Sequence, residues 1–215
     1  MSEVELLNWA RGPGLNIATF IMLFGIVLRI FEILSLGNPK DLAEARASGA
    51  AEGWRTIFRR SVPEKRHWKR ITAGYLYHIG LFVVIFLFVP HIQFFKETLG
   101  LFWPGVANDI VDFFTVLSIG ALLYVLFSRI TTPERRILST KHDYLIWLVT
   151  FLPFLTGYMA YHRLIGDYTF MLAIHILSVE LLMIILPFSK LSHAFSFIFA
   201  RWYTGVRFGR RGIQA

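Results

Sequence analysis

The sequence predicts an all-α integral membrane bundle of five transmembrane helices, with the N-terminus outside and the C-terminus in the cytoplasm. Hydrophobic residues make up 55% of the chain and charged residues only 17%, so a soluble domain would expose much of its apolar surface. Five apolar stretches are each long enough to cross a hydrocarbon core of about 30 Å. Lysine and arginine are concentrated in blocks between these stretches, as in membrane proteins of fixed orientation.

The five predicted spans follow one another along the chain, which is expected to form a single membrane domain of residues 1–215. No basic segment precedes the first stretch, so we expect a retained helix and not a signal peptide. The fifth span is expected to continue toward His193. The spans run from Gly14 to Leu36, Ala73 to Ile92, Ile110 to Phe127, Tyr144 to His162 and Phe170 to Phe188.

The orientation follows from the basic residues. The loop at 37–70 carries nine of them, the connection between the third and fourth spans four, and the tail at 194–215 another four. Cytoplasmic loops are enriched in lysine and arginine, so these three segments are predicted to be cytoplasmic. The basic loop has two interpretations, a surface for lipid headgroups or a docking surface for a cytoplasmic subunit. It is long enough to hold a short helix, which the alanine and glutamate residues between Ala43 and Trp54 favour.

Composition also excludes several functions. The chain has no cysteine, which excludes iron–sulfur ligation, thioether attachment of heme and disulfides within it. The net charge of +8 does not indicate nucleic-acid binding, because the basic residues act as topology signals. A transporter is not favoured either, since no inverted repeat is evident.

Two apolar regions each carry two histidines, His78 with His91 and His175 with His193. Histidine in hydrocarbon usually indicates ligation or proton handling. At a helical rise of about 1.5 Å per residue, the two separations correspond to about 20 and 27 Å. Because the second and fifth spans run in opposite directions, we expect His91 beside His175 near the outer face and His78 beside His193 near the inner face. Two stacked metal centres follow from this pairing.

Paired neutral imidazoles suit heme iron and leave no open coordination position, which favours electron transfer over oxygen chemistry. In a regular helix His175 and His193 would project from the same face, because their spacing equals five turns. The spacing of the other pair rotates His91 about 140° away from His78, so its role depends on a bend at Pro90. Pro187 similarly predicts a bend between His175 and His193. The alternative for each histidine is a hydrogen-bonded position in the core without a metal. For His91, a quinone site or a proton path is a further alternative.

Further polar residues are candidates near the two membrane faces. His162 is a competing ligand, a quinone-site residue or an interfacial residue, and Lys96 is a quinone-site residue or a snorkelling lysine. Glu180 serves a proton path or a structural hydrogen bond and is not expected to be catalytic. Lys190 and the tail arginines contact heme propionates or lipid phosphates. The full set of quinone-site candidates is His91, Gln93, Lys96, Tyr161, His162, Arg163 and Asp167.

The segment from His175 to His193, HILSVELLMIILPFSKLSH, resembles the last heme-binding helix of the respiratory nitrate reductase gamma-subunit family. The run Tyr77-His78-Ile79-Gly80 and the opening Gly12-Pro13-Gly14 are similar to the same family. Related members of this family are subunits of three kinds of complex: complexes that resemble heterodisulfide reductase, membrane complexes associated with sulfite reduction, and complexes with molybdenum enzymes. One departure is that the gamma subunit places the two histidines of its second helix closer together.

This resemblance implies a diheme b-type cytochrome in the cytoplasmic membrane of a prokaryote. It implies two heme b groups, with His78 and His193 on the inner iron and His91 and His175 on the outer iron. It also implies an exchangeable quinone or menaquinone and a cytoplasmic iron–sulfur, flavin or molybdenum redox subunit. The chain is then expected to be the quinone-reactive electron-transfer subunit of an oxidoreductase complex. An alternative of another class is a heme-free anchor or assembly subunit for a cytoplasmic redox enzyme.

Overall fold

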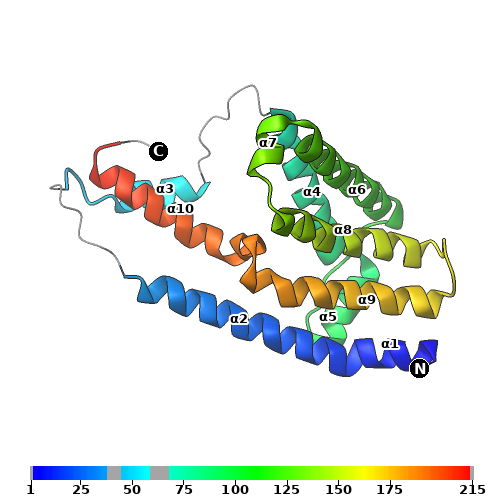
Figure 1. Cartoon of the computed structure of the whole chain (residues 1–215). Coiled ribbons are helices and arrows are strands. Elements are labelled where there is room, and N and C mark those ends of the chain that lie inside the picture. The colour runs from blue at the N-terminus through cyan, green and yellow to red at the C-terminus, as the bar shows by residue number, and fades with distance from the viewer. Residues whose placement is uncertain (1, 38–44, 59–67, 214–215) are drawn as a thin grey trace. The chain divides into compact units, whose positions relative to one another are not determined.

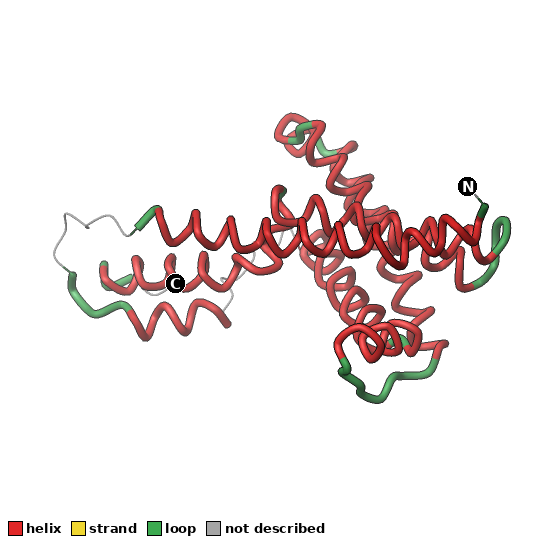
Figure 2. The backbone as a smooth tube through the Cα atoms, turned by 90° about the horizontal axis from the view of Figure 1, so that it is seen from below, coloured by secondary structure: helices red, strands yellow, loops and turns green. Residues whose placement is uncertain are grey.

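The computed structural model describes residues 2–37, 45–58 and 68–213 (Figure 1). These residues form helices joined by short connections, and no strand occurs among them (Figure 2). Residues 38–44 and 59–67 of the predicted basic loop, and 214–215 of the tail, lie outside the described residues. Five helices are long and apolar enough to cross a membrane: Glu3–Ser35, Trp68–Leu87, Asn108–Thr131, Lys141–Tyr161 and Tyr168–Phe188. The prediction of an all-α, multi-pass membrane protein is confirmed.

The first span begins eleven residues before the predicted Gly14. Helix α1 (Glu3–Trp9) starts at a capping box, in which the Ser2 hydroxyl accepts from the backbone of Glu5 and the Glu5 carboxylate accepts from the backbone of Ser2. A π-helical segment, η1 (Ala10–Gly14), follows and leads into α2 (Leu15–Ser35). The cap explains the early start, because it supplies partners for donors that a helix end leaves unsatisfied.

The second span is interrupted where the sequence analysis predicted a continuous helix to Ile92. Helix α4 (Trp68–Leu87) ends before Phe88, which is extended with φ −80° and ψ 123°. Helix α5 (Val89–Leu99) then begins with Pro90 in its first turn and ends at Gly100, whose φ of 71° is left-handed. Proline has no backbone N–H and its ring clashes with the carbonyl four residues earlier, so Pro90 cannot continue α4 but is tolerated in the first turn of α5.

The third span extends beyond its predicted position at both ends, and the fourth begins three residues early and ends one residue before the predicted His162. Helix α6 (Asn108–Thr131) is joined through α7 (Pro133–Leu138) to α8 (Lys141–Tyr161). Thr140 and Asp143 form a capping box at the start of α8, which adds a polar first turn to the apolar stretch.

The fifth span does not continue as a regular helix to His193, and that expectation is wrong. Helix α9 (Tyr168–Ile185) passes into the short 3₁₀ segments η3 (Leu186–Phe188) and η4 (Lys190–Ser192). Between them Ser189 is extended, with φ −130° and ψ −176°. Helix α10 (His193–Arg210) therefore starts anew at His193, and the same-face argument for His175 and His193 does not apply. A bend at Pro187 is confirmed.

The chain divides into two compact units. The first combines residues up to Asn16 with α4 to α9 as far as Leu182. Its closest helix pair is α4 with α6, where Gly80 lies against the backbone carbonyl of Phe114 and the side chain of Ser118. Ser118 is fully buried and donates to the Phe114 carbonyl at 2.7 Å. Small residues let membrane helices approach closely at such points.

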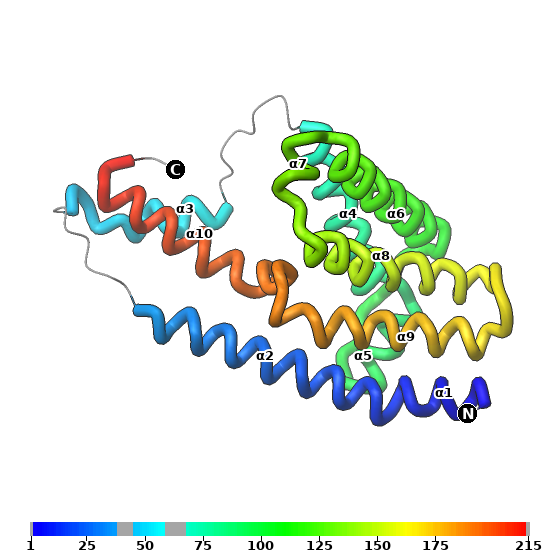
Figure 3. The backbone as a smooth tube through the Cα atoms, viewed as in Figure 1, coloured from blue at the N-terminus to red at the C-terminus, as the bar shows by residue number. Residues whose placement is uncertain are grey.

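The second unit combines α2 from Ile17 with α3 (Ala50–Phe58), η3 from Leu186, η4 and α10. Helices α3 and α10 lie side by side (Figure 3). They meet through two glycine pairs spaced four residues apart, Gly49 with Gly53 and Gly205 with Gly209. The Arg201 side chain also donates to the carbonyl of Thr56 at 2.7 Å. The sequence analysis expected a short helix within residues 43–54, which overlaps the observed α3.

Replacing Gly80 by alanine is expected to destabilise the first unit by about 1–3 kcal/mol, the usual cost of overpacking. The added methyl would lie 2.8 Å from the Phe114 carbonyl oxygen and closer still to Ser118. Gly120→Ala on α6 is the matched control, because nothing lies within 4 Å of its new methyl. Chemical unfolding in detergent measures both variants. Equal stability of the two variants would contradict the packing described.

Candidate metal centre

His91 on α5 and His175 on α9 lie beside one another in the first unit. Their imidazole ring centroids are 6.2 Å apart and the ring planes differ by only 19°. The two residues come from helices that are far apart in the sequence and were predicted to pair near the outer membrane face. The structure therefore brings together the pair that depended on a bend at Pro90.

The chain break before α5 positions His91. Because Phe88 is extended, His91 does not keep the direction it would have on a continued α4. Its Nδ1 instead lies 2.7 Å from the carbonyl of Val84, back across the break. The ring of Phe88 packs against the imidazole edge to face, with centroids 5.2 Å apart. The imidazole is thus fixed by both a hydrogen bond and a ring contact.

His175 is positioned by helix α8. A methyl group at Gly157 would lie 2.9 Å from Cε1 of His175, so the imidazole occupies the space that a side chain would need. Nδ1 of His175 lies 3.2 Å from the hydroxyl of Thr156. That hydroxyl is 3.1 Å from the hydroxyl of Ser178, which donates to the carbonyl of His175 at 2.7 Å. Thr156 and Ser178 are both buried, so this polar cluster holds one imidazole orientation.

The arrangement suits a metal ion held by two imidazoles. In both rings Nδ1 lies within hydrogen-bond distance of an oxygen, the Val84 carbonyl for His91 and the Thr156 hydroxyl for His175. A hydrogen bond on the second ring nitrogen is the usual way in which a protein orients a ligating histidine. Two imidazoles on opposite sides of one metal, with bonds of about 2 Å each, hold their ring centroids about 6 Å apart. The observed centroid distance of 6.2 Å, between rings that are stacked and nearly parallel, is of that length.

Two histidines could serve as axial ligands of a heme, which needs fewer protein ligands than a metal held by the protein alone. Over the described ranges, no group of three or more histidine, cysteine, aspartate or glutamate side chains gathers as a metal site. Structural zinc needs four protein ligands and catalytic zinc three. Heme iron needs only axial ligands from the chain, because the macrocycle supplies the rest. Two histidines therefore fit a heme.

The two inner histidines belong to different units. His78 lies on α4 in the first unit, with Nδ1 2.6 Å from the carbonyl of Gly74. His193 begins α10 in the second unit, with Nδ1 2.8 Å from the carbonyl of Lys190. All four histidines thus share one feature, a hydrogen bond at Nδ1. The pairing of His78 with His193 stays a prediction.

His162, the competing ligand, has a different environment. Its Nε2 lies 3.1 Å from a carboxylate oxygen of Asp112 on α6. It also packs against Tyr158, with ring centroids 4.4 Å apart. The nitrogen that would bind iron is therefore engaged with a carboxylate. The structure brings His91, and not His162, against His175.

An aromatic chain connects His162 to the histidine pair. Tyr161 contacts His162 edge to face at 5.1 Å and Phe88 at 5.3 Å, and Phe88 contacts His91. Three of the predicted quinone-site residues, His91, Tyr161 and His162, therefore gather in one cluster with Asp112.

The remaining candidates make other contacts. Lys96 lies over the ring of Phe102 at 5.2 Å, and Arg163 lies over the ring of Tyr168 at 5.4 Å. Asp167 accepts from the backbone of Thr169 at the start of α9, and Gln93 is exposed. None of these four has a described contact with the aromatic cluster.

Sequence reasoning missed several residues of the site. Asp112, Thr156 and Ser178 are polar residues within apolar helices, and such positions in a membrane usually have a function. That signal was present in the sequence for Asp112. The role of Gly157 could not have been found, because a glycine within a helix does not reveal which side chain it accommodates.

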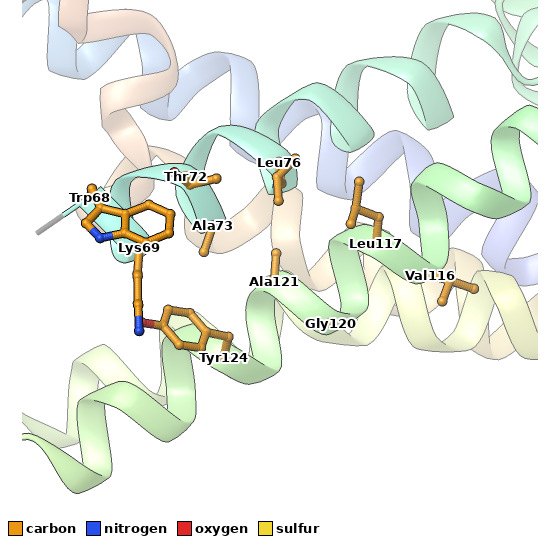
Figure 4. Close-up of a pocket in the computed structure, with 10 residues that line it drawn as sticks. All are labelled: Trp68, Lys69, Thr72, Ala73, Leu76, Val116, Leu117, Gly120, Ala121 and Tyr124. Atoms are coloured by element: carbon orange, nitrogen blue, oxygen red, sulfur yellow. The ribbon is translucent and has the colours of Figure 1, made fainter.

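A groove of about 500 Å³ lies elsewhere in the first unit, between α4 and α6 (Figure 4). Trp68, Lys69 and Tyr124 lie at one end of it, and Leu76 and Leu117 lie further along. No histidine lines it, so it is separate from the metal centre. An apolar surface with tryptophan and lysine at one end is typical of helices that face lipid near the bilayer surface.

Part of the chain aligns with a known protein. A protein of Nitratidesulfovibrio vulgaris strain Hildenborough is 37% identical over 142 residues, which are 65% of this chain and 62% of that protein. Its name, "Protein", states no activity. The chain thus spans less than two thirds of the length of this relative. No family model matches the chain, and no solved structure matches it.

The proximity of His91 and His175 can be tested without any metal, because the chain has no native cysteine. We expect His91→Cys combined with His175→Cys to be joined efficiently by a bifunctional thiol reagent of short span. Lys141→Cys with His175→Cys is the control, since position 141 starts α8 about 24 Å before Gly157. Mass spectrometry of the digested protein measures the cross-link. Equal yields for the two pairs would refute the arrangement.

Proposed function

We propose that the chain is a diheme b-type cytochrome, the quinone-reactive electron-transfer subunit of a respiratory oxidoreductase complex in the cytoplasmic membrane of a prokaryote. The observation that carries the proposal is the pair of near-parallel imidazoles of His91 and His175, 6.2 Å apart with Nδ1 engaged in each. One heme b would be held by this pair, and a second heme b by His78 and His193. The two hemes would supply one-electron redox chemistry to the membrane interior.

The chain's own residues account for the proton chemistry of a quinol. Oxidation of a quinol to a quinone releases two electrons and two protons, so its site needs a proton acceptor beside an apolar slot. The His162 imidazole, oriented by its hydrogen bond to Asp112, is such an acceptor. Tyr161 and Phe88 lie between this pair and His91 and supply apolar walls. Reduction of a quinone would use the same groups in reverse.

The proposed cytoplasmic partner is an iron–sulfur, flavin or molybdenum redox subunit with an acidic surface. Helices α3 and α10 and their flanks support this proposal. Their described residues include six arginines and a single acidic residue, Glu52. Opposite charges steer electron-transfer partners into register. Helix α10 starts five residues after Phe188, the end of the fifth span, so this surface is tethered close to the membrane. The arginines are Arg46, Arg55, Arg201, Arg207, Arg210 and Arg211.

A reduced-minus-oxidised optical spectrum of the purified chain tests the central proposal. We expect a b-type signal equivalent to two hemes per chain. His91→Gln and His175→Gln should each remove one heme, because each leaves an iron with a single axial ligand. His162→Gln should retain both. No b-type signal from the assembled protein would favour the heme-free anchor instead, and loss of a heme only in His162→Gln would overturn the pairing of His91 with His175.

Asp112→Asn is expected to slow quinol oxidation by about 10²-fold, the usual contribution of a positioned acid–base group, while heme content stays unchanged. The amide cannot stabilise a protonated His162. Asp109→Asn is the matched control, since Asp109 is exposed on the same helix and should react at the normal rate. Stopped-flow reduction of the hemes by a menaquinol analogue measures the effect. A normal rate for Asp112→Asn would exclude this acceptor.

A further inference from the structure

Glu180 is a buried carboxyl group that the proposed electron path does not use. It lies on α9, five residues after His175, and only 5% of its surface is exposed. Its Oε1 has no hydrogen-bond partner among the described residues. Acidic side chains within the hydrocarbon region are costly and usually functional. The free-energy cost of burying this carboxyl group therefore indicates that the group has a function.

The π-helical segment η1 forms one wall of the Glu180 site. A methyl group at Gly14 would lie 2.9 and 3.0 Å from the two carboxylate oxygens, so both oxygens rest against the backbone of Gly14. The ring of Trp9 lies against the same point of the backbone. Any larger residue at position 14 would displace the carboxyl group.

The conformation of this wall is an independent indication of function. π-Helical turns are rare and occur frequently at functional sites. Pro13 lies within the segment and has no backbone N–H. The rare π-helical turn and the buried carboxyl with an unpartnered oxygen therefore meet at Gly14.

The charged groups of the surrounding elements do not neutralise Glu180. On α1 and η1 these groups are Glu3, Glu5 and Arg11, all exposed, and Glu5 is bound in the N-terminal cap. On α9 itself the nearest titratable group is His175. No ion pair joins Glu180 to any described residue in the structure. A proton is therefore the available counter-charge.

We propose that Glu180, seated against Gly14 of the π-helical segment, is a proton-binding site linked to the redox state of the centre at His91 and His175. Five residues along α9 correspond to about 7.5 Å of axial rise. The two charges are further apart than this rise, because the side chains lie about 140° apart around the helix. Charges interact over longer distances in a low-dielectric interior than in water. When one electron reaches the centre, the Glu180 carboxylate takes up one proton, and when the electron leaves, that proton is released. This inference rests on the proposed heme function.

Redox titration of the heme-loaded protein over a range of pH tests the link. For the wild type we expect the potential of one heme to fall with rising pH, by up to about 59 mV per pH unit for one proton per electron. Glu180→Gln should flatten this slope while keeping both hemes. Gly14→Ala should reduce or displace it, because the methyl moves the carboxyl. Glu97→Gln, an exposed acid on the helix that carries His91, is the control and should behave as the wild type.

Infrared difference spectroscopy gives a second readout that depends on the carboxyl itself. The reduced-minus-oxidised spectrum of the wild type and of Glu97→Gln should contain a carboxylic acid C=O band that Glu180→Gln lacks. Two hemes with an unchanged pH slope and an unchanged band in Glu180→Gln would overturn the proton site and leave the cytochrome intact. Should Glu180→Gln fail to assemble, an unchanged slope in Gly14→Ala would overturn it equally. Absence of heme from the wild type would overturn both proposals.

Discussion

The hydrocarbon interior of a membrane offers no hydrogen-bond partners, and the internal structure of this protein depends on that constraint. Most polar side chains within a span therefore find a partner in their own helix or in a neighbouring one, and Glu180 Oε1 is the exception among the described residues. Buried hydroxyls meet this need by donating back to carbonyls one turn earlier, as Thr115 does to Val111 and Ser118 to Phe114. Imidazoles of the spans do the same through Nδ1, as His78 does to Gly74.

This use of Nδ1 connects local structure with the proposed chemistry. A neutral imidazole has one donor and one acceptor nitrogen. When Nδ1 donates to a backbone carbonyl, as at Val84 for His91, Nε2 becomes the acceptor and therefore a metal ligand. The same requirement that makes a polar group tolerable in lipid thus selects the tautomer that heme iron binds. In His162 the partner is a carboxylate at Nε2, which suits proton exchange instead.

The number and type of the spans could be predicted from apolar length, because a span needs little beyond about 20 apolar residues. Their ends could not, since polar caps such as Ser2 with Glu5 extend helices past the apolar stretch. Pro90 and Pro187 indicated bends correctly. The direction that each helix takes after its bend depends on the backbone angles of Phe88 and Ser189. These angles do not follow from the identity of the residue. For that reason the proximity of His91 to His175 could be inferred only from their similar depth in the membrane. For the same reason the expectation of a regular helix through His193 was wrong.

Asp112 was missed because it lies close to the predicted end of a span, where an acidic residue is commonly solvated. Its significance appears only when α6 and α8 are seen together, with His162 as its partner.

Three glycines specify the interior as closely as the polar residues do. Gly80 admits the side chain of Ser118, Gly157 admits the imidazole of His175, and Gly14 admits the carboxyl of Glu180. In each case a methyl group added to the glycine would overlap a polar atom of the neighbouring side chain, or the ring that carries this atom. Gly120, by contrast, faces open space and could carry a side chain. Because helices in lipid gain little from apolar contact with one another, close approach at small residues is a main source of their specificity. In this chain that approach orients one candidate ligand and one buried acid, so loss of a single glycine would act on the site as directly as loss of the side chain that it accommodates.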